Sequence, residues 1–540
     1  MAEPVSQDIT GQSASERSWG QACREALRPE VLRMGFLGFS AGLPILLIFS
    51  TLSVWLREAG VDRSTVTFLS WAALGYSFKF VWAPLVDRLP VPVLTKRLGR
   101  RRGWMLTAQL ALIGAMLWTS AFDPITGILY SAIGAVLIGF ASATQDIVID
   151  AYRIESADAR LQSMMSSFYI AGYRVGMLVA GAGALWLAEG LAEPGVAYDF
   201  SAWAWTYRIM AVAMLIGVLT TLLIPEPTIK GASKDPGLAA SVSDQIRFLG
   251  AFLLCAAGFV GAFTLLGAPL AALSASLQES LGFAKHLAGF LTASLRLILA
   301  VGAALLVGLA TTRFGVVPLA RLRHAYYDPV SDFFERYGKV ALLLLVLIGT
   351  YRIADVVMGV IANVFYIDLG FTKGDIATYT KFWGLIATLI GGFLGGLFAL
   401  RFGVMRAMMT GALLAAVTNV LFAVLAGIGP STPALAVVIV ADNISAGMAS
   451  AAFVAYLSSL TNVSFTAMQY ALFSSLMTLF PKLLAGYSGG MVDAVGYQSF
   501  FIGTALLGLP VLVLVWLAAR LTPPDATPDP NRAVAEDPGP

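Results

Sequence analysis

Charged residues are scarce in this chain. Only 12% of its 540 residues are Asp, Glu, Lys or Arg, whereas 58% are hydrophobic. A soluble globular domain carries about 25% charged residues, so the composition excludes one large water-soluble core and predicts a membrane protein. The formal net charge is only +3 and no basic stripe alternates with aromatic residues, so we expect no nucleic-acid partner.

Cysteine and histidine are almost absent. Cys23 lies in the polar N-terminal segment and Cys255 lies in an apolar stretch, so we expect no disulfide framework. The two histidines have no CxxC pair beside them, and we predict neither a metal site nor a cofactor. Residues 1–30 lack the regions of a cleaved signal peptide. No Walker A loop or catalytic triad is found, so we do not expect an enzyme.

Long apolar stretches dominate what is present. A helix of about 20 apolar residues crosses the hydrocarbon core of a bilayer. We predict fourteen membrane spans, at residues 31–55, 64–84, 103–122, 128–150, 162–188, 202–224, 247–272, 286–311, 339–366, 376–400, 404–428, 433–457, 466–490 and 497–520.

Basic residues gather in the loops after the second, eighth and tenth spans. If every span crosses, these loops lie on one side, and the positive-inside rule makes that side cytoplasmic. The loop at 189–201 contains only acidic charges. Both termini are then expected in the cytoplasm. The clustered basic residues are Arg88, Lys96, Arg97, Arg100, Arg101, Arg102, Arg313, Arg321, Arg323, Arg336, Lys339, Arg401 and Arg406.

The second half of the chain repeats a pattern of the first. GVDRSTV at 60–66 follows the first span, and GFTKGDI at 370–376 follows the ninth, at an offset of 310 residues (370 minus 60). Each motif precedes a span that leads into a basic turn. Repeated halves are how many secondary transporters build two access states around one central site.

The repeat predicts an all-α membrane protein with two six-helix bundles and two additional helices between them. The predicted domains are a cytoplasmic tail at 1–30, a first bundle at 31–224, a linker with the extra helices and a cytoplasmic loop at 225–338, a second bundle at 339–520 and a disordered tail at 521–540.

The turn after the second span resembles the loop signature of the major facilitator superfamily. It reads APLVDR at 83–88 and GRRRGW at 99–104, and the turn after the tenth span reads GGLFALRFGVMR at 395–406. An acid at a helix end can meet basic groups and the partial charge of a neighbouring helix terminus in one conformation and lose them in another. We therefore predict that Asp87 and Arg88 act in gating.

Several longer strings together resemble the AmpG muropeptide permease family. They include GFSAGLP at 38–44, SATQDIVIDAYRIE at 142–155, GYRVGMLVAGAGALWLAE at 172–189, YRIADVVMGVIANVFYIDLGFTKGDI at 351–376 and DNISAGMASAAFVAYLSSL at 442–460. The resemblance covers about residues 31–520.

This resemblance implies a function that composition does not show. Permeases of the family lie in the inner membrane of Gram-negative bacteria and import N-acetylglucosaminyl-1,6-anhydro-N-acetylmuramyl peptides for peptidoglycan recycling. Transport is driven by the proton motive force, and the imported fragments influence β-lactamase induction and so antibiotic resistance. The expected partners are the anhydromuropeptide, protons and the lipid bilayer, with the protein as a monomer.

Such a substrate carries carboxylates, an amine and two acetamido sugars, so its site needs cations, hydrogen-bonding amides and aromatic surfaces. Arg174 lies about 12 residues into the fifth span, roughly 18 Å deep, and its guanidinium offers a fork for a carboxylate. The alternative for Arg174 is an internal ion pair. The predicted substrate-binding residues are Arg174, Gln145, Lys79, Arg352, Asn443, Tyr173 and Tyr351.

Acids deep within the spans are candidates for proton coupling, because ionisable groups in a membrane span are costly and are usually functional. We predict this role for Asp355, Asp442 and Asp146. Arg352 and Asp355 are three residues apart and either form a self-contained salt bridge or a pair that proton or substrate disrupts. Asp442 has no basic residue in its own span.

Asp146 and Asp150 are four residues apart and share one helix face. We predict that Asp150 belongs to the gate. The alternative for these acids is that they pair with Lys79 or with the basic residues Arg153 and Arg88. For Lys79, which lies nearer the cytoplasmic end of its span, the alternative to substrate binding is that its side chain extends to the membrane surface.

Two further features have structural interpretations. Gly172 and Gly176 form a small-xxx-small pattern, which is typical of close helix packing. Arg296 in the eighth span is expected to have a structural partner.

Two other functions compete with muropeptide import. The chain could carry another amphiphilic or acyl-linked solute, since related carriers share the superfamily frame. It could also be a non-transporting membrane assembly factor. Such a factor would not need charges around a central site, so the buried Arg, Asp and Lys residues favour transport.

Overall fold

The computed structural model describes residues 27–61, 78–157, 161–196, 198–227, 241–281, 283, 285–371, 375–485 and 488–522. The described residues are almost entirely helical and include no β-strand. Most of the predicted second span, with 62–77, lies outside them. An all-α membrane fold is therefore confirmed for the described part of the chain.

The chain divides into two compact units. The first contains residues 1–232 and 332–540, and the second contains residues 233–331. The second unit thus lies inside the predicted linker at 225–338. The division of the first unit into two six-helix bundles stays a prediction.

The N-terminal part of the first unit is built from helices that are often interrupted by short π-helical or 3-10 segments. They are α2 (Pro29–Leu46), η1 (Leu47–Thr51), α3 (Leu52–Glu58), η3 (Lys79–Val81), α6 (Ala83–Arg88), α7 (Leu94–Leu98), α8 (Arg100–Thr119), α9 (Pro124–Ser156), α10 (Gln162–Leu178), η5 (Val179–Gly183), α11 (Ala184–Leu191), α12 (Phe200–Ala213) and α13 (Leu215–Leu223).

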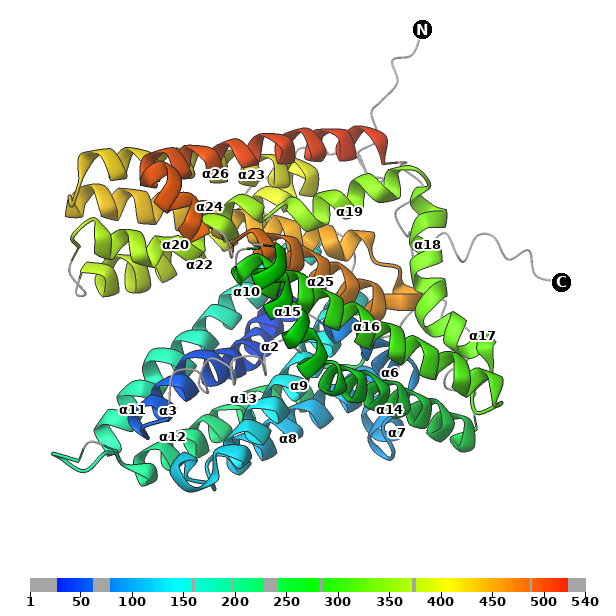
Figure 1. Ribbon diagram of the computed structural model, residues 1–540. Coiled ribbons are helices and arrows are strands. Elements are labelled where there is room, and N and C mark those ends of the chain that lie inside the picture. Colours follow the sequence, from blue (N-terminus) through cyan, green and yellow to red (C-terminus); the bar gives the residue numbers. More distant parts are fainter. Residues whose placement is uncertain are drawn as a thin grey trace, which may run out of the picture. The chain divides into compact units, whose positions relative to one another are not determined.

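The C-terminal part of the first unit contains longer helices, of which α23, α24 and α26 lie side by side (Figure 1). This half comprises α19 (Val340–Thr350), α20 (Ile353–Asp368), η7 (Ile376–Trp383), α22 (Gly384–Phe402), α23 (Val404–Ile428), α24 (Thr432–Leu460), η8 (Val463–Phe465), α25 (Thr466–Ala485) and α26 (Ser488–Leu521). Helix α18 (Asp328–Tyr337) leads into it from the second unit.

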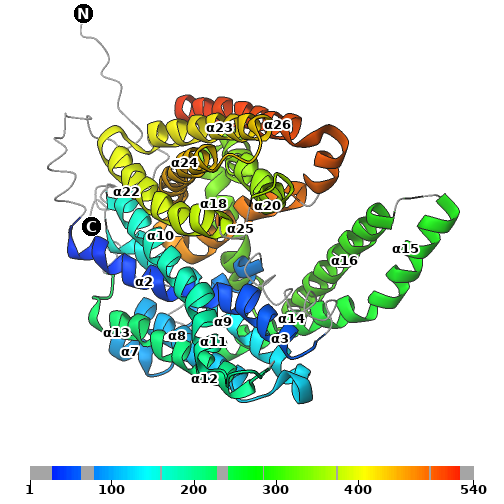
Figure 2. The same ribbon diagram turned by 90° about the vertical axis from the view of Figure 1, so that its left-hand side faces the viewer.

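The second unit consists mainly of α14 (Val242–Leu265), α15 (Gly267–Leu281) and α16 (Lys285–Arg313), followed by α17 (Leu319–Leu322) and η6 (Arg323–Tyr327). Helices α14 and α16 pack against each other (Figure 2). The Nε of Arg296 donates to the carbonyl of Phe263 at 2.6 Å, and its guanidinium lies 3.9 Å from the centre of the Phe263 ring. Arg296 therefore has the structural partner that we expected.

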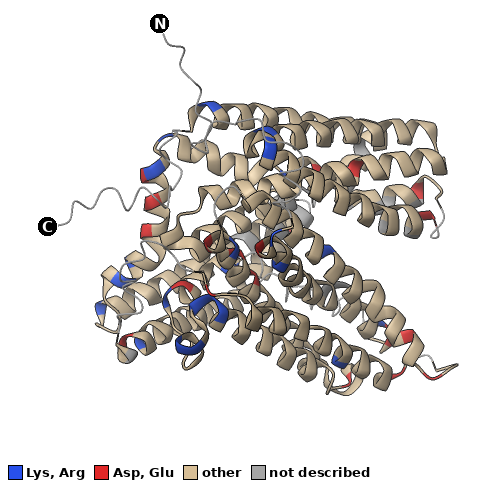
Figure 3. Ribbon diagram, turned by 180° about the vertical axis from the view of Figure 1, so that it is seen from behind, with Lys and Arg blue, Asp and Glu red and all other residues tan. Residues whose placement is uncertain are grey.

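Ten helices in the described part of the chain are long and apolar enough to cross a membrane. The protein is therefore a polytopic membrane protein, while the count of fourteen spans is not confirmed. The predicted spans 31–55, 103–122 and 466–490 are largely helical but are not among the ten. Charged residues are sparse along most of the helices, as Figure 3 shows.

Glycines allow the backbones of α2 and α10 to touch. A β-carbon added to Gly172 would overlap the carbonyl oxygen of Gly35, and one on Gly176 would overlap that of Phe39. In the same interface a β-carbon on Gly42 would overlap the carbonyl of Tyr173. The predicted small-xxx-small packing of Gly172 and Gly176 is thus confirmed, and it fixes the position of α10.

We predict that Gly172→Ala destabilises the protein, because the added methyl group must push α2 and α10 apart. Overpacking of this kind costs about 1–3 kcal/mol. Thermal unfolding of the purified protein in detergent measures the effect. Gly190→Ala is the matched control, because a β-carbon there meets no atom within 4 Å. Equal unfolding temperatures for the two variants would contradict the packing argument.

Candidate functional site

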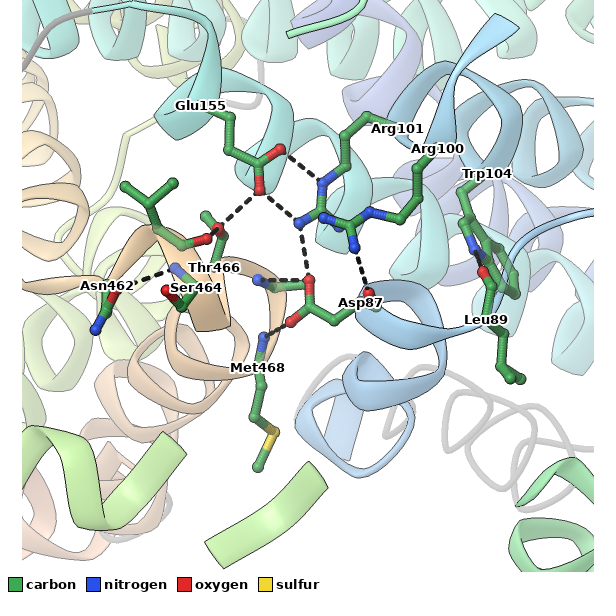
Figure 4. A network of polar contacts seen from close by, with 12 residues as sticks. Asp87, Leu89, Arg100, Arg101, Trp104, Glu155, Asn462, Ser464, Thr466 and Met468 are labelled. Atoms are coloured by element: carbon green, nitrogen blue, oxygen red, sulfur yellow. Dashed lines mark hydrogen bonds and ion pairs between the residues drawn. The ribbon is translucent and has the colours of Figure 1, made fainter. Parts of the chain in front are cut away.

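Polar contacts join the two halves of the first unit where α6, α8 and α9 meet the start of α25 (Figure 4). We call this network the lock. It consists of Asp87, Arg101 and Glu155 from the N-terminal half and Thr466, Ala467 and Met468 from the C-terminal half.

Asp87, at the end of α6, meets two kinds of positive charge. One carboxylate oxygen accepts a hydrogen bond from Arg101 at 2.8 Å. The carboxylate also accepts from the backbone N–H of Met468 at 3.0 Å and that of Ala467 at 3.3 Å. These amides belong to the first turn of α25, where the helix dipole favours a negative charge. Asp87 therefore joins an N-terminal cation to the N-terminus of a C-terminal helix.

Arg101 and Glu155 complete the lock. Arg101 is 2% exposed and donates to the two oxygens of Glu155 at 2.9 and 2.5 Å. Burial lowers the pKa of the Arg101 guanidinium, but Glu155 and Asp87 outweigh this effect and raise the pKa above its ordinary value. Glu155 also accepts from the hydroxyl of Thr466 at 2.7 Å, so it too links the halves.

A second set of charges lies on α9 near the lock. Asp150 pairs with Lys79 at 3.6 Å and with Arg153 at 3.3 Å, and Lys79 is 6% exposed. The pairing of Lys79 with Asp150, which we had considered as an alternative, is therefore what the structure contains. Arg153 donates to Ser458 of α24 at 2.6 Å and lies 5.1 Å from the centre of the Tyr470 ring. It forms another link between the halves.

Helices α10 and α22, one from each half, also pack directly against each other. The hydroxyl of Ser163 donates to the carbonyl of Gly396 at 3.3 Å, and the rings of Phe168 and Phe393 are 6.4 Å apart. A β-carbon on Gly396 would overlap the hydroxyl oxygen of Ser167. This tight interface extends the contact between the halves along the start of α10.

Arg352 lies where the predicted ninth span is broken. Helix α19 ends at Thr350, and α20 begins at Ile353. The Nε of Arg352 donates to Asp355 at 3.1 Å, and an Nη donates to Ser450 of α24 at 2.6 Å.

Asp442 lies on α24, where one carboxylate oxygen accepts from Thr418 at 3.3 Å. It is within electrostatic reach of both Asp355 and Arg352. The partner of Asp442 thus comes from other helices, as its own span contains no base. Asp355, Arg352 and Asp442 therefore lie in one polar region of the C-terminal half.

Arg174 projects from α10 and is partly exposed. It makes no hydrogen bond or ion pair with another residue that the structure describes, so the internal ion pair that we had considered is not observed there. Its charge is within electrostatic reach of Arg352 in the other half. The structure therefore brings one cation from each half into the same region. Arg174, the cation on α10, has no counter-ion among the described residues.

The predicted aromatic and amide residues have different surroundings. Tyr351 is 6% exposed, donates its hydroxyl to the carbonyl of Met408 and stacks on Phe453, which favours a packing role. Asn443 accepts from Thr388 at 2.8 Å and is partly exposed. Tyr173 is partly exposed beside Arg174.

Gln145 and Asp146 lie deeper than expected. Gln145 is 0% exposed, donates to Ser40 of α2 at 3.1 Å and has a buried Oε1 with no partner among the described residues. Asp146 is 7% exposed, and its Oδ1 likewise finds no partner in the described chain. Burial inside the N-terminal half favours a structural role for Gln145, whereas Asp146, with one carboxylate oxygen unpartnered among the described residues, remains a candidate for protonation.

Arg88 lies at the end of α6, next to Asp87. The cation that binds Asp87 in the described contacts of the lock is Arg101, and the predicted gating role of Arg88 stays a prediction. We did not predict roles for Arg101, Glu155 and Thr466. The motif GRRRGW contained a signal for Arg101, since its glycine begins a helix whose first turn carries three arginines.

Known proteins resemble the chain over most of its length. It matches the Major Facilitator Superfamily over residues 34–326 and 340–538. It is 30% identical to putative transporter AmpG 4 of Rickettsia felis, with 90% of this chain and 95% of that protein covered. It is 28% identical to the anhydromuropeptide permease of Escherichia coli K12, with 90% and 79% covered.

Solved structures share the fold. The proton:xylose symporter XylE bound to 6-bromo-6-deoxy-D-glucose has a TM-score of 0.57 at 13% identity, with 93% of this chain and 96% of that chain covered. A variant of the E. coli fucose:proton symporter FucP has a TM-score of 0.56 at 13% identity, with 92% and 99% covered. The protein is thus a transporter rather than an enzyme, and the chain belongs to the AmpG family of the major facilitator superfamily.

Proposed function

We propose that this protein imports 1,6-anhydromuropeptides across the bacterial inner membrane and that protons drive the import. The observation that carries the proposal is Arg174 of the N-terminal half, which lies within electrostatic reach of Arg352 of the C-terminal half and has no partner among the described residues. A cation without a counter-ion inside a membrane span is costly. An anionic substrate would supply that counter-ion, and the name of the E. coli relative supports a muropeptide as this anion.

The peptide carboxylates of the substrate would bind Arg174 and compete with Asp355 for Arg352. Guanidinium groups bind carboxylates through two parallel hydrogen bonds. Asn443 lies on α24, which also carries Ser450, the partner of Arg352, and it offers an amide for an acetamido group. Tyr173, next to Arg174, offers a ring for a sugar face. Lys79, Gln145 and Tyr351 already have partners, so we give them supporting roles at most.

Proton coupling would follow from the same competition. When a substrate carboxylate displaces Asp355 from Arg352, that acid loses its counter-ion near a second acid, Asp442. A carboxylate that loses a neighbouring cation binds a proton more readily. Uptake of a proton would then accompany uptake of the substrate. Asp146 is the third candidate.

The lock would close the cytoplasmic side while the substrate enters. Asp87, Glu155 and Arg153 provide the described hydrogen bonds of this end, and they must separate from α24 and α25 for release into the cytoplasm. In a host with an inducible β-lactamase, the imported fragments would also influence its induction. A monomer in the bilayer would suffice, with no cofactor.

Carriage of a different anionic or amphiphilic solute is the second candidate function, since the two arginines alone do not select among carboxylates. A competition assay with unlabelled solutes would distinguish the two. The membrane assembly factor gains no support, because such a protein has no need of a buried cation such as Arg174, which has no counter-ion among the described residues.

We expect Arg174→Lys to reduce uptake of labelled anhydromuropeptide into proteoliposomes by about tenfold or more. Lysine keeps the charge but loses the bidentate fork, and hydrogen bonds to charged groups contribute about 1.5–3 kcal/mol. Arg208→Lys is the matched control, since Arg208 lies over the ring of Trp205 on α12. Normal uptake by Arg174→Lys would show that Arg174 does not bind substrate.

We expect Asp355→Asn or Asp442→Asn to abolish accumulation driven by a proton gradient and to leave substrate exchange at equilibrium largely intact. Asparagine resembles the protonated acid in shape but does not titrate, and exchange needs no net proton movement. Asp146→Asn is tested in parallel. The control is Asp368→Asn, at the exposed end of α20. If all three variants accumulate substrate with the pH dependence of the unchanged protein, another group carries the proton.

The orientation can be tested by cysteine labelling. In a background with Cys23→Ser and Cys255→Ser, Glu193→Cys should react with an impermeant maleimide added to the periplasmic side, whereas Lys96→Cys should not. Both positions are exposed, so accessibility depends only on the side of the membrane. The reverse labelling pattern would place the basic loops, and with them the lock, in the periplasm.

A further inference from the structure

Helix α18 carries the chain from the second unit into the C-terminal half of the first. From Asp332 onward its residues belong to the first unit. In the sequence, Arg336 is one of the basic residues that gather in the loops. In the structure, Asp332 and Arg336 face the turn between α24 and α25, and both bind it.

Asp332 accepts hydrogen bonds from three described side chains. The amides of Asn462 and Gln469 each donate to it at 2.8 Å, and the Nε of Arg336 donates to it at 2.9 Å. Asn462 precedes α25, and Gln469 lies in its first turn. The carboxylate of Asp332 is therefore bound by one residue that precedes α25 and by one residue in its first turn.

Arg336 and Gln469 complete this arrangement. An Nη of Arg336 donates to the carbonyl of Leu460, at the end of α24, and to the Oε1 of Gln469, both at 3.2 Å. The same Oε1 accepts from the backbone N–H of Asn462 at 2.7 Å. Gln469 is 1% exposed, so its amide is fully used inside the protein.

The apolar side of α18 also packs against α25. The rings of Phe333 and Phe473 of α25 are 5.1 Å apart, and Phe333 is 3% exposed. Tyr337 is 2% exposed, and its burial raises the pKa of its hydroxyl to about 12 although Arg336 acts in the opposite direction. Helix α18 is thus held to the start of α25 by polar and apolar contacts together.

The residues that α18 binds are adjacent to those that bind the other half. Thr466, Ala467 and Met468 donate to Glu155 and Asp87, and Gln469 follows them directly in the chain. The first turn of α25 therefore receives Asp87 of the N-terminal half and Asp332 of α18. A displacement of α18 would move the amides that bind Asp87.

We infer that α18 positions the lock, with Asp332 and Arg336 holding the first turn of α25 where Asp87 and Glu155 can reach it. This assigns to α18 a role in setting the balance between the closed and open states of the cytoplasmic side. The inference rests on the proposed function only in that the lock must open for transport. It gives a purpose to the segment that connects the extra helices to the C-terminal half.

The test uses a reporter of the lock that needs no substrate. In the background without Cys23 and Cys255, Ala467→Cys places a thiol at a position that is 1% exposed when the lock is closed. Adding Asp332→Ala should raise the rate of maleimide labelling at this thiol by about tenfold, because hydrogen bonds to a charged acceptor are lost. Unchanged labelling of the folded Asp332→Ala protein would overturn the inference.

Two further variants separate positioning from general loss of structure. Asp328→Ala removes an acid from the same helix, one that pairs with His324, and should leave labelling unchanged. Exchanging the partners, with Asp332→Asn and Asn462→Asp together, restores an amide–carboxylate pair and should return labelling toward the starting rate. Failure of this rescue, or an equal increase in Asp328→Ala, would also count against positioning by Asp332.

If Asp332→Ala does not reach the membrane, Asn462→Ala removes one donor and leaves the pair of Asp332 with Arg336 intact. It should raise labelling in the same direction by a smaller factor. No increase in this folded variant would equally overturn the inference. Because labelling is read without substrate, absence of muropeptide uptake by the unchanged protein would count against the proposed function alone.

Discussion

The high cost of unpaired charge in an apolar protein is the constraint on which this structure depends. Charged groups in a membrane span are expensive unless they find partners. In the lock, Asp87 meets this condition by binding Arg101 and two amides at the start of α25. Since those amides belong to the other half, pairing one acid also holds two halves together. Breaking a buried pair leaves a lone charge, so the lock can open only when other interactions replace it.

Glycine packing supplies the rigidity that such pairing needs. The backbones of α2 and α10 are in contact at Gly172 and Gly176, and those of α22 and α24 approach equally closely at Gly391 and Gly447. We expect helices held this closely to move as pairs when the two halves separate. Arg174 on α10 and Ser450 on α24, which orients Arg352, are thereby carried on separate rigid pairs. A change in the spacing of these pairs changes the distance between the two cations.

Much of the fold could be predicted from the sequence, and less of the site. Helices were expected wherever apolar stretches reach the length of a span, because every backbone group in lipid must be hydrogen bonded internally. The identity of Arg101 as the cation that binds Asp87 could not be predicted in this way, since several basic residues follow the same span. Gln145 could not be recognised as buried against Ser40, because the sequence does not show which face of its span meets α2. The sequence also does not show which backbone amides, such as that of Met468, bind a side chain of the other half.

The sequence by itself determined the membrane class, the family and the repeat, because composition, span length and motif order do not depend on which side chains meet. Only the tertiary structure decided the partners. Asp87 and Ala467 are 380 residues apart in the chain, and their contact exists only because α6 and α25 pack together. Asp332 and Gln469 are also distant in the chain, and only the folded structure brings them into hydrogen-bonding contact. Solvation by hydrocarbon acts on each segment separately, whereas a hydrogen bond requires two groups to be placed within about 3 Å of each other.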